Sequence, residues 1–387
     1  MSQRTRILSV AAALALGACA TPPREEQAMA PAFEGEMRVT EHRGQDDLLT
    51  GGLGLAGLAS PTPPAGSDAA ALRRRALHAN WRGIADLAGG GYAGIANVPG
   101  REFSAFARVP GASSPHRVLA QVPDAFDARK RCLVVAPSSG SRGIYGAIAV
   151  ASHWALPRGC AVAFTDKGTG TGFVDLDARD GVALDGTRVA LDAGVPVELA
   201  PNGNAAQPHR VAIKHAHSGD NPEAQWGAHV LAAARFGLQA LDAAFPDQAP
   251  FTAENTRVIA LGLSNGGGAV LKAGEQDDEG LIDAVVAVAP NIAAPGARTL
   301  FDVGTEAALL QPCALLAIAD APALLPEPAW KGLATLRCAS LKAAGLVDGA
   351  DAPAQAADAL ARLRAGGWTD GALSDAGVNL TFDLWRA

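Results

Sequence analysis

Short apolar runs alternate with longer segments of helical spacing through the middle of the chain. The strand-length runs are 117–122, 131–137, 160–165, 257–262 and 283–289, and the helix-like segments are 69–87, 144–156 and 224–245. Strands that alternate with helices in this way usually build parallel βαβ units. The pattern therefore predicts an α/β protein with a mainly parallel sheet and helices on both faces.

Two of the strand-like runs, 132–136 and 285–289, contain no charged or hydrogen-bonding side chain. A strand with one solvated face alternates apolar and polar residues, whereas a strand covered on both faces has no such alternation. Both runs are therefore expected to be buried on both sides of the sheet.

Composition divides the chain into segments. Residues 20–68 are polar and irregular and then rich in Gly, Pro and Ser, which predicts a flexible N-terminal segment without a core. Residues 69–300 carry the α/β rhythm, except that the rhythm breaks over 166–221, a length typical of a functional insertion or lid. Within it, the glycine-rich stretch 168–172 predicts a mobile loop beside the pocket. Residues 301–387 are Ala/Leu-rich and predict a helical C-terminal segment, an incomplete continuation of the fold.

The first nineteen residues follow a different pattern. Arg4 and Arg6 precede an apolar run over 7–18 that is too short to span a bilayer, as in an export signal. The run ends in Leu16-Gly17-Ala18-Cys19, which is similar to the lipobox of bacterial lipoproteins; a signal peptide with a chance cysteine gives the same letters. We expect an exported protein, either secreted or periplasmic, with membrane attachment only through a lipid on Cys19.

Charge and cysteine content narrow the class further. The 387-residue chain has a formal net charge of −7 and no basic stripe, which argues against nucleic acid as a partner. Its one arginine cluster, Arg73-Arg74-Arg75, is most simply a solvated helix face. Apart from Cys19, four cysteines remain. Cys132 and Cys160 both open strand-like runs and could bridge neighbouring strands, although two buried thiols would give the same pattern.

The clearest chemical signal is Gly262-Leu263-Ser264-Asn265-Gly266. It directly follows the buried strand 257–262 and precedes helix-compatible residues, which is the strand, turn and helix context of a nucleophile elbow. The competing interpretation is an ordinary glycine-rich turn with a small residue in it. The context favours Ser264 as the nucleophile of an α/β-hydrolase-like fold.

An oxyanion site can be read from the same pattern. The backbone N–H of Asn265, at the start of the following helix, would be one donor to a developing oxyanion. The second should come from the loop after an earlier strand, and the Ser138-Ser139-Gly140 segment after 132–136 suits that role, with Ser139 at its centre.

The general base is missing from its expected place, because all eight histidines precede Ser264. Three explanations compete: the acid and the histidine lie beyond Ala387, an upstream histidine serves, or the protein is no longer a catalyst. The first is favoured. The second would use His215 and His217, whose alternate spacing places both imidazoles on one strand face. The pair could also be half of a metal site, but zinc needs three or four ligands, and a polar lid strand is the simpler interpretation. Asp320 could be the acid or an ordinary surface residue.

Three segments together resemble one known family. They are 261–271 (LGLSNGGGAVL), 214–226 (KHAHSGDNPEAQW) and 166–172 (DKGTGTG), within a likeness that runs from about His42 to Pro290. They resemble the bacterial D-(-)-3-hydroxybutyrate oligomer hydrolases. The resemblance implies an exported serine esterase that acts downstream of the polyhydroxybutyrate depolymerases and cleaves short oligomers to monomers. It implies Ser264 as nucleophile, longer family members, and the remaining charge-relay residues beyond this chain.

The expected reaction is acyl transfer through Ser264, with 3-hydroxybutyrate oligomers as the binding partner and no metal or organic cofactor. Two rival functions remain open from the sequence. One is a carboxylesterase or peptidase of broader specificity on the same fold. The other is an envelope lipoprotein that binds oligomers without turnover.

Overall fold

The structure is a computed structural model that describes residues 33–81, 94–140, 142–168, 170, 172–200, 210–214, 221–293, 295–318 and 329–373. The predicted signal segment 1–19 with Cys19, the histidines at 215 and 217, and Asp320 lie outside these residues. None of the described helices combines the length and the apolar character needed to cross a bilayer.

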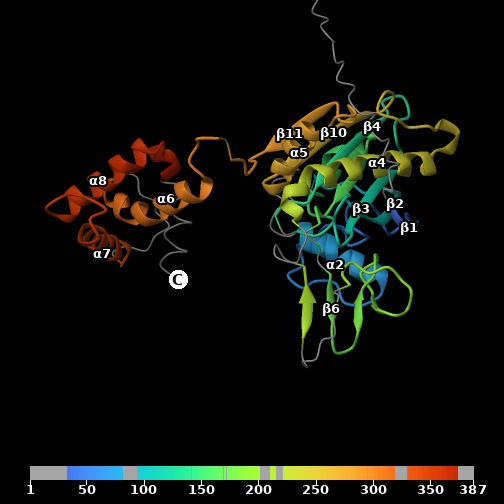
Figure 1. Ribbon diagram of the computed structural model, residues 1–387, viewed down its shortest axis with the longest axis horizontal. Helices are drawn as coiled ribbons and strands as arrows, with labels where there is room; N and C mark the ends of the chain where they lie inside the picture. The colour runs from blue at the N-terminus through green and yellow to red at the C-terminus, as the bar shows by residue number, and fades with distance from the viewer. Residues whose placement is uncertain are drawn as a thin grey trace, which may run out of the picture.

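A mixed sheet forms the body of the molecule (Figure 1). Its strands in chain order are β1 (Phe33–His42), β2 (Gly100–Ala107), β3 (His116–Pro123), β4 (Cys132–Pro137), β5 (Ala161–Thr165), β10 (Arg257–Leu263) and β11 (Ala284–Val288). Their spatial order is β1-β2-β3-β5-β4-β10-β11. The four strands from β5 to β11 pair in parallel, whereas β1, β2 and β3 add to β5 in antiparallel fashion. The sheet is thus less uniformly parallel than the sequence predicts.

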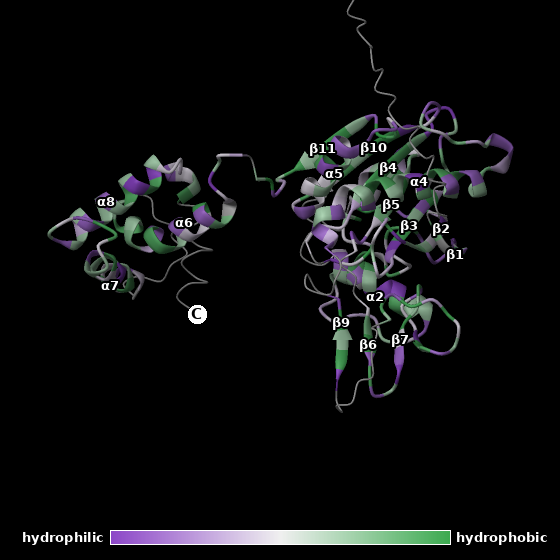
Figure 2. Ribbon diagram, in the orientation of Figure 1, coloured by the Kyte–Doolittle hydropathy of each residue, from purple (hydrophilic) through white to green (hydrophobic). Residues whose placement is uncertain are grey.

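Alternate residues of the central strands enter two cores. Leu133 and Val135 of β4 face one cluster, while Val134 and Ala136 face the other. The first cluster is covered by α4 (Trp226–Ala244) and α5 (Asn265–Gln276), and the second by α2 (Ala69–Trp81) and α3 (Ser152–Ala155). The strands at the centre of the sheet are accordingly green in Figure 2. This explains the missing polar alternation at 132–136.

The second unbroken apolar run, 285–289, is not covered on both faces of the sheet. Strand β11 is the last strand of the described sheet, and its valines are substantially solvent-accessible: Val285 is 37% exposed and Val288 47%. The expectation of a strand buried on both sides therefore fails here. The physical reason is that, within the described residues, no further strand or covering helix packs against its outer edge.

The N-terminal segment also differs from the sequence expectation. Residues 33–42 form β1, which pairs with β2, and a short helix follows, α1 (Gly54–Ala59). Leu48, Leu49 and Leu58 are almost completely buried in the second core. Because these leucines are separated by glycines and polar residues, their burial depends on contacts with α2 and the sheet, and local periodicity does not reveal it.

The segment 166–221 contains a separate small antiparallel sheet. Its strands are β6 (Phe173–Asp175), β7 (Asp180–Val182), β8 (Arg188–Ala190) and β9 (Val211–Ile213), in the order β8-β7-β6-β9. They extend away from the large sheet, beyond α2 (Figure 1). The predicted break in the α/β rhythm thus corresponds to a different local architecture.

Helices α6 (Leu300–Ala314), α7 (Ala329–Ala343) and α8 (Ala352–Ala365) pack on one another in a separate group (Figure 1). A disulfide between Cys313 and Cys338 joins α6 to α7. A second disulfide joins Cys132 to Cys160 at the start of the adjacent strands β4 and β5, as one reading of the sequence expected.

Candidate active site

Ser264 lies at the junction of β10 and α5, between the last strand residue and the first helical residue. Its backbone has φ 57° and ψ −121°, a conformation that non-glycine residues rarely adopt. Two hydrogen bonds hold it: the Ser264 N–H donates to Val288 O at 2.9 Å, and Gly268 N–H donates to Ser264 O at 3.1 Å. The strand, strained turn and helix predicted from the sequence are therefore present.

A side chain at either Gly262 or Gly266, the glycines that flank Ser264, would clash with the backbone. A Cβ added at Gly262 would lie 2.0 Å from the carbonyl oxygen of Gly266, and one added at Gly266 would lie 2.8 Å from Pro137 O. Both distances are shorter than any real Cβ contact with a backbone atom. The turn can consequently form only when these two positions lack a side chain.

The loop after β4 lies directly against the elbow. Gly140 has φ +52°, and a Cβ placed on it would be 3.8 Å from the side-chain oxygen of Asn265. Ser138 N–H is used by Thr165 O at 2.9 Å, while no backbone acceptor in the described part of the chain takes the N–H of Ser139. The loop containing Ser139 therefore lies next to the helix start, and the role of its N–H as an oxyanion donor stays a prediction.

No hydrogen bond joins Ser264 to a histidine among the described residues. His229, on α4, places its Nδ1 2.8 Å from Gln225 O, and its ring meets that of His116 edge to face at 4.5 Å between centroids. Burial and the neighbouring His229 hold the pKa of His116 well below its usual range. The general base of Ser264 stays a prediction, because His215, His217 and Asp320 lie outside the described residues.

The sequence reasoning missed a buried lysine at this site. Lys167 follows β5, is fully buried, and directs its ammonium into the loop after β4. Nζ donates to Ser138 O, to Ser138 Oγ at 2.8 Å and to Gly140 O at 3.2 Å. Desolvation lowers the pKa of Lys167 to about 8, although Asp166 acts in the opposite direction. The available signal was a lysine placed between a buried strand and a glycine-rich stretch.

Next to Lys167, Gly170 and Gly172 lie against the buried carboxylate of Glu198. A Cβ on Gly170 or Gly172 would come within 2.4 or 2.6 Å of a Glu198 carboxylate oxygen, so these two glycines are packed against it. The mobility expected for the stretch 168–172 stays a prediction. Arg117 Nε donates to Glu198 at 2.9 Å. Burial, with the charge of Glu198, raises the pKa of Asp166 to about 6.

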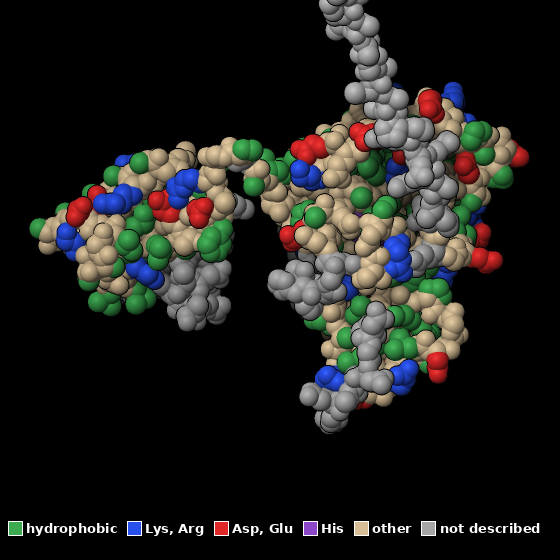
Figure 3. Space-filling model, in the orientation of Figure 1, with side chains coloured by type: hydrophobic (Ala, Val, Ile, Leu, Met, Phe, Trp, Pro, Cys, Tyr) green, Lys and Arg blue, Asp and Glu red, His purple; other side chains and the backbone are tan. Residues whose placement is uncertain are grey.

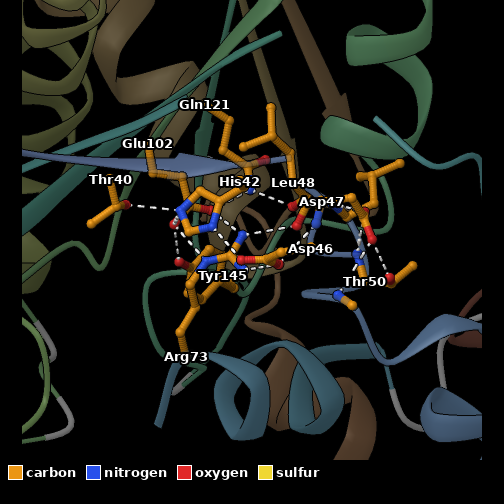
Figure 4. Close-up of polar contacts among 12 residues, drawn as sticks. Thr40, His42, Asp46, Asp47, Leu48, Thr50, Arg73, Glu102, Gln121 and Tyr145 are labelled. Atoms are coloured by element: carbon orange, nitrogen blue, oxygen red, sulfur yellow. Dashed lines mark hydrogen bonds and ion pairs between the residues drawn. The ribbon is translucent and has the colours of Figure 1, made fainter. Parts of the chain in front are cut away.

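Tyr145, which follows the loop after β4, belongs to a mostly buried ionic cluster with His42, Asp46, Arg73 and Glu102 (Figure 4). Tyr145 Oη donates to Glu102 at 2.7 Å, and Arg73 donates to both Glu102 oxygens at 2.8 and 2.9 Å. His42 Nδ1 lies 2.7 Å from Asp46 Oδ2.

The cluster corrects the interpretation of the arginine run. The Arg73 side chain is only 11% exposed and points into the cluster, so this member of the run does not belong to a solvated face. The reason is its partner, because Glu102 on β2 is only 5% exposed and its buried carboxylate needs a cation.

The cluster predicts a pH dependence of stability. Burial alone would lower the pKa of His42, but the hydrogen bond with Asp46 and the carboxylate of Glu102 raise it above its ordinary 6.5. Because the pKa of His42 is higher in the folded state than in the unfolded state, its protonation stabilises the fold fully below pH 6.5. This stabilisation is lost as the pH rises through the pKa of His42 in the folded state. His116, with a lowered pKa, acts in the opposite sense.

We therefore expect the difference in unfolding free energy between wild type and His42→Gln to be largest near pH 5.5 and to shrink toward pH 8.5. Urea unfolding followed by tryptophan fluorescence would measure it at each pH, and the subtraction cancels the His116 contribution. A difference that stays constant across this range would refute the proposed protonation of His42.

Among the described residues, no group of three or more His, Cys, Asp or Glu side chains is placed to hold a metal ion. A cavity of about 670 Å³ lies beside the ionic cluster, between α2 and the small sheet, with Phe173 and Val182 on its wall. Its lining does not include Ser264. On the face seen in Figure 3, acidic and basic side chains are interspersed.

Comparison with known families gives one match over most of the chain. Residues 15–377 match the profile of the family described as 3HB-oligomer hydrolase. The match extends on both sides of the stretch from His42 to Pro290 that carried the resemblance.

Curated relatives give the same picture. A D-(-)-3-hydroxybutyrate oligomer hydrolase of Paracidovorax citrulli is 41% identical over 87% of this chain and 56% of its own length. One of Burkholderia cenocepacia is 41% identical over 93% of this chain and 60% of its own. The chain therefore spans somewhat more than half the length of these relatives.

Among solved structures, feruloyl esterase B from Aspergillus oryzae aligns with 70% of this chain and 47% of its own, at 13% identity and a TM-score of 0.31. An esterase from the same organism aligns with 59% of this chain and 32% of its own, at 17% identity and a TM-score of 0.30. Neither similarity is close enough to assign a function.

Proposed function

Because this chain belongs to the 3HB-oligomer hydrolase family, we propose that it hydrolyses short 3-hydroxybutyrate oligomers to monomers with Ser264 as the nucleophile. The single observation that carries the proposal is the conformation of Ser264, held at φ 57° between β10 and α5. A strained serine raised at such a junction is the arrangement in which α/β hydrolases present their nucleophile.

The reaction proceeds in two acyl-transfer steps. Ser264 Oγ attacks the ester carbonyl carbon, its proton passes to a general base, and the carbonyl oxygen becomes an oxyanion. The N–H groups of Asn265 and Ser139 stabilise that charge, together with the positive end of α5. The C–O bond then breaks, the shortened oligomer leaves as an alcohol, and water hydrolyses the acyl-serine to release 3-hydroxybutyrate and regenerate Ser264.

Two further features belong to this proposal. The insertion 166–221 acts as a lid, which its start directly after β5, where Lys167 contacts the loop containing Ser138, supports. The protein is exported, which the leader-like residues 1–19 and two disulfides support, since disulfides persist outside the cytoplasm. Fractionation of expressing cells would refute export if the protein remained with the cytosol.

A substrate panel tests the function. We expect the chain to release monomer from 3-hydroxybutyrate dimer and trimer, measured by chromatography, at a higher kcat/KM than it cleaves p-nitrophenyl butyrate or a peptide. A preference for p-nitrophenyl butyrate would instead indicate a carboxylesterase of broad specificity. Saturable binding of the trimer without release of monomer would indicate an oligomer-binding protein.

A further inference from the structure

We propose that Lys167 is a positioning residue that holds the Ser138-Ser139-Gly140 loop in the orientation required for the oxyanion site. This inference rests on the proposed function, and it concerns a residue that neither the elbow pattern nor the acyl-transfer mechanism uses. Lys167 is a fully buried cation that directly follows the end of β5.

The ammonium is saturated by this loop. An ammonium group has three N–H donors, and Nζ of Lys167 has three acceptors: Ser138 O, Ser138 Oγ and Gly140 O. The ring of Trp226 faces the charge at 5.4 Å and excludes water from that side. A buried charge is tolerated only when it is bonded in this way, so the lysine and the loop require each other.

The carbonyl contacts determine where the oxyanion donor points. In a trans peptide the C=O and the N–H project in opposite directions, so fixing Ser138 O on the ammonium turns the N–H of Ser139 away from Lys167. If that peptide rotated, it would present a carbonyl oxygen where a donor is needed. Lys167 therefore prevents the rotation that would close the oxyanion site.

The loop is close enough to the elbow for this control to matter. A Cβ on Gly266 would lie 3.4 Å from Ser138 O, and one on Gly140 would lie 3.8 Å from the Asn265 side chain. Lys167 itself has φ 58°, a strained backbone for a lysine. Such strain is retained where the surrounding contacts fix a residue, and here those contacts belong to the loop.

The chain offers a matched control in Arg131, at the opposite end of β4. Arg131 also has positive φ, at 43°, donates to two backbone carbonyls, those of Gln248 and Pro250, and lies over an aromatic ring, that of Phe251 at 4.5 Å. It differs from Lys167 in lying at the opposite end of β4 from the elbow and in being partly exposed. Arg131→Met thus removes a similar set of contacts without touching the oxyanion loop.

The first test is kinetic, with 3-hydroxybutyrate dimer as substrate. Lys167→Met should lower kcat about 10²-fold with KM nearly unchanged, because the loss falls on an interaction made in the transition state. Arg131→Met should keep kcat within about 3-fold of wild type. A Lys167→Met enzyme that is folded and retains wild-type kcat would overturn the proposal, as would an equal loss in Arg131→Met.

A second readout does not require turnover. Backbone amide exchange in peptides covering residues 137–147 should become faster in Lys167→Met and remain at the wild-type rate in Arg131→Met. Unchanged exchange in folded Lys167→Met overturns the inference even if the protein is an active esterase. Faster exchange supports it even if no ester is cleaved, in which case the proposed function fails separately.

The wild type provides a third readout that needs no variant. The charged neighbour that acts on Lys167 is Asp166, and its other contacts, Ser138, Gly140 and Trp226, are neutral. Loss of the ammonium proton, with a pKa of about 8, should produce an alkaline fall in kcat. The fall should disappear in Lys167→Met, or in Lys167→Gln if the methionine variant does not fold. A wild-type kcat that stays level through pH 9.5 would contradict the role.

Discussion

Ser264→Ala should reduce kcat for 3-hydroxybutyrate dimer by at least about 10⁴-fold, since removal of a serine nucleophile leaves only the oxyanion site and binding to accelerate the reaction. The loss should appear in kcat, because the small change from hydroxyl to hydrogen leaves the rest of the site intact. Stopped assays that quantify released monomer would measure it.

The control for this variant is Ser340→Ala, at an exposed position on α7. It should retain wild-type kcat, and both variants should keep the wild-type far-UV circular dichroism. Undiminished cleavage in Ser264→Ala would remove the elbow from the mechanism. A wild type that cleaves no 3-hydroxybutyrate dimer would contradict the proposed function itself.

Glu102→Leu should destabilise the fold by about 3–5 kcal/mol, because it removes the buried carboxylate partner of Arg73 and leaves its nearly buried guanidinium only the partly exposed Asp46, 3.1 Å away. Glu102 also accepts the hydrogen bond of Tyr145, which is lost in this variant. Burial by itself would raise the pKa of Glu102, but Arg73 and His42 lower it far below its usual range, so the carboxylate is charged at neutral pH. Urea unfolding at pH 7 measures the loss.

The double variant Arg73→Met with Glu102→Leu distinguishes an uncompensated charge from lost packing. It should recover part of the stability, because neither ion is then buried alone. Asp124→Ala breaks the ion pair of Arg43 and Asp124, whose side chains are 43% and 35% exposed, and should cost much less. Equal losses in Glu102→Leu and in the double variant would mean that the charges contribute little.

The positions of several strands could be predicted from the sequence, because an apolar run and the glycines that end it determine backbone conformation within a few residues. The strands 132–137 and 257–263 and the helix 226–244 lie close to their expected bounds. The same reasoning failed at β11, since local pattern reports how apolar a strand is and not whether a neighbour covers it. It also failed at β1, where pairing with β2 decides the structure.

The elbow at Ser264 was determined by the sequence alone, because its requirements are local: a strand, two positions without side chains and a helix start within ten residues. The tertiary structure decided which charged residues support it. Lys167 reaches Ser138 across 29 residues of sequence, and Arg73 reaches Glu102 across the same separation. Such partners meet only when strands and helices pack, and the cost of burying a charge without a partner then fixes where each side chain points.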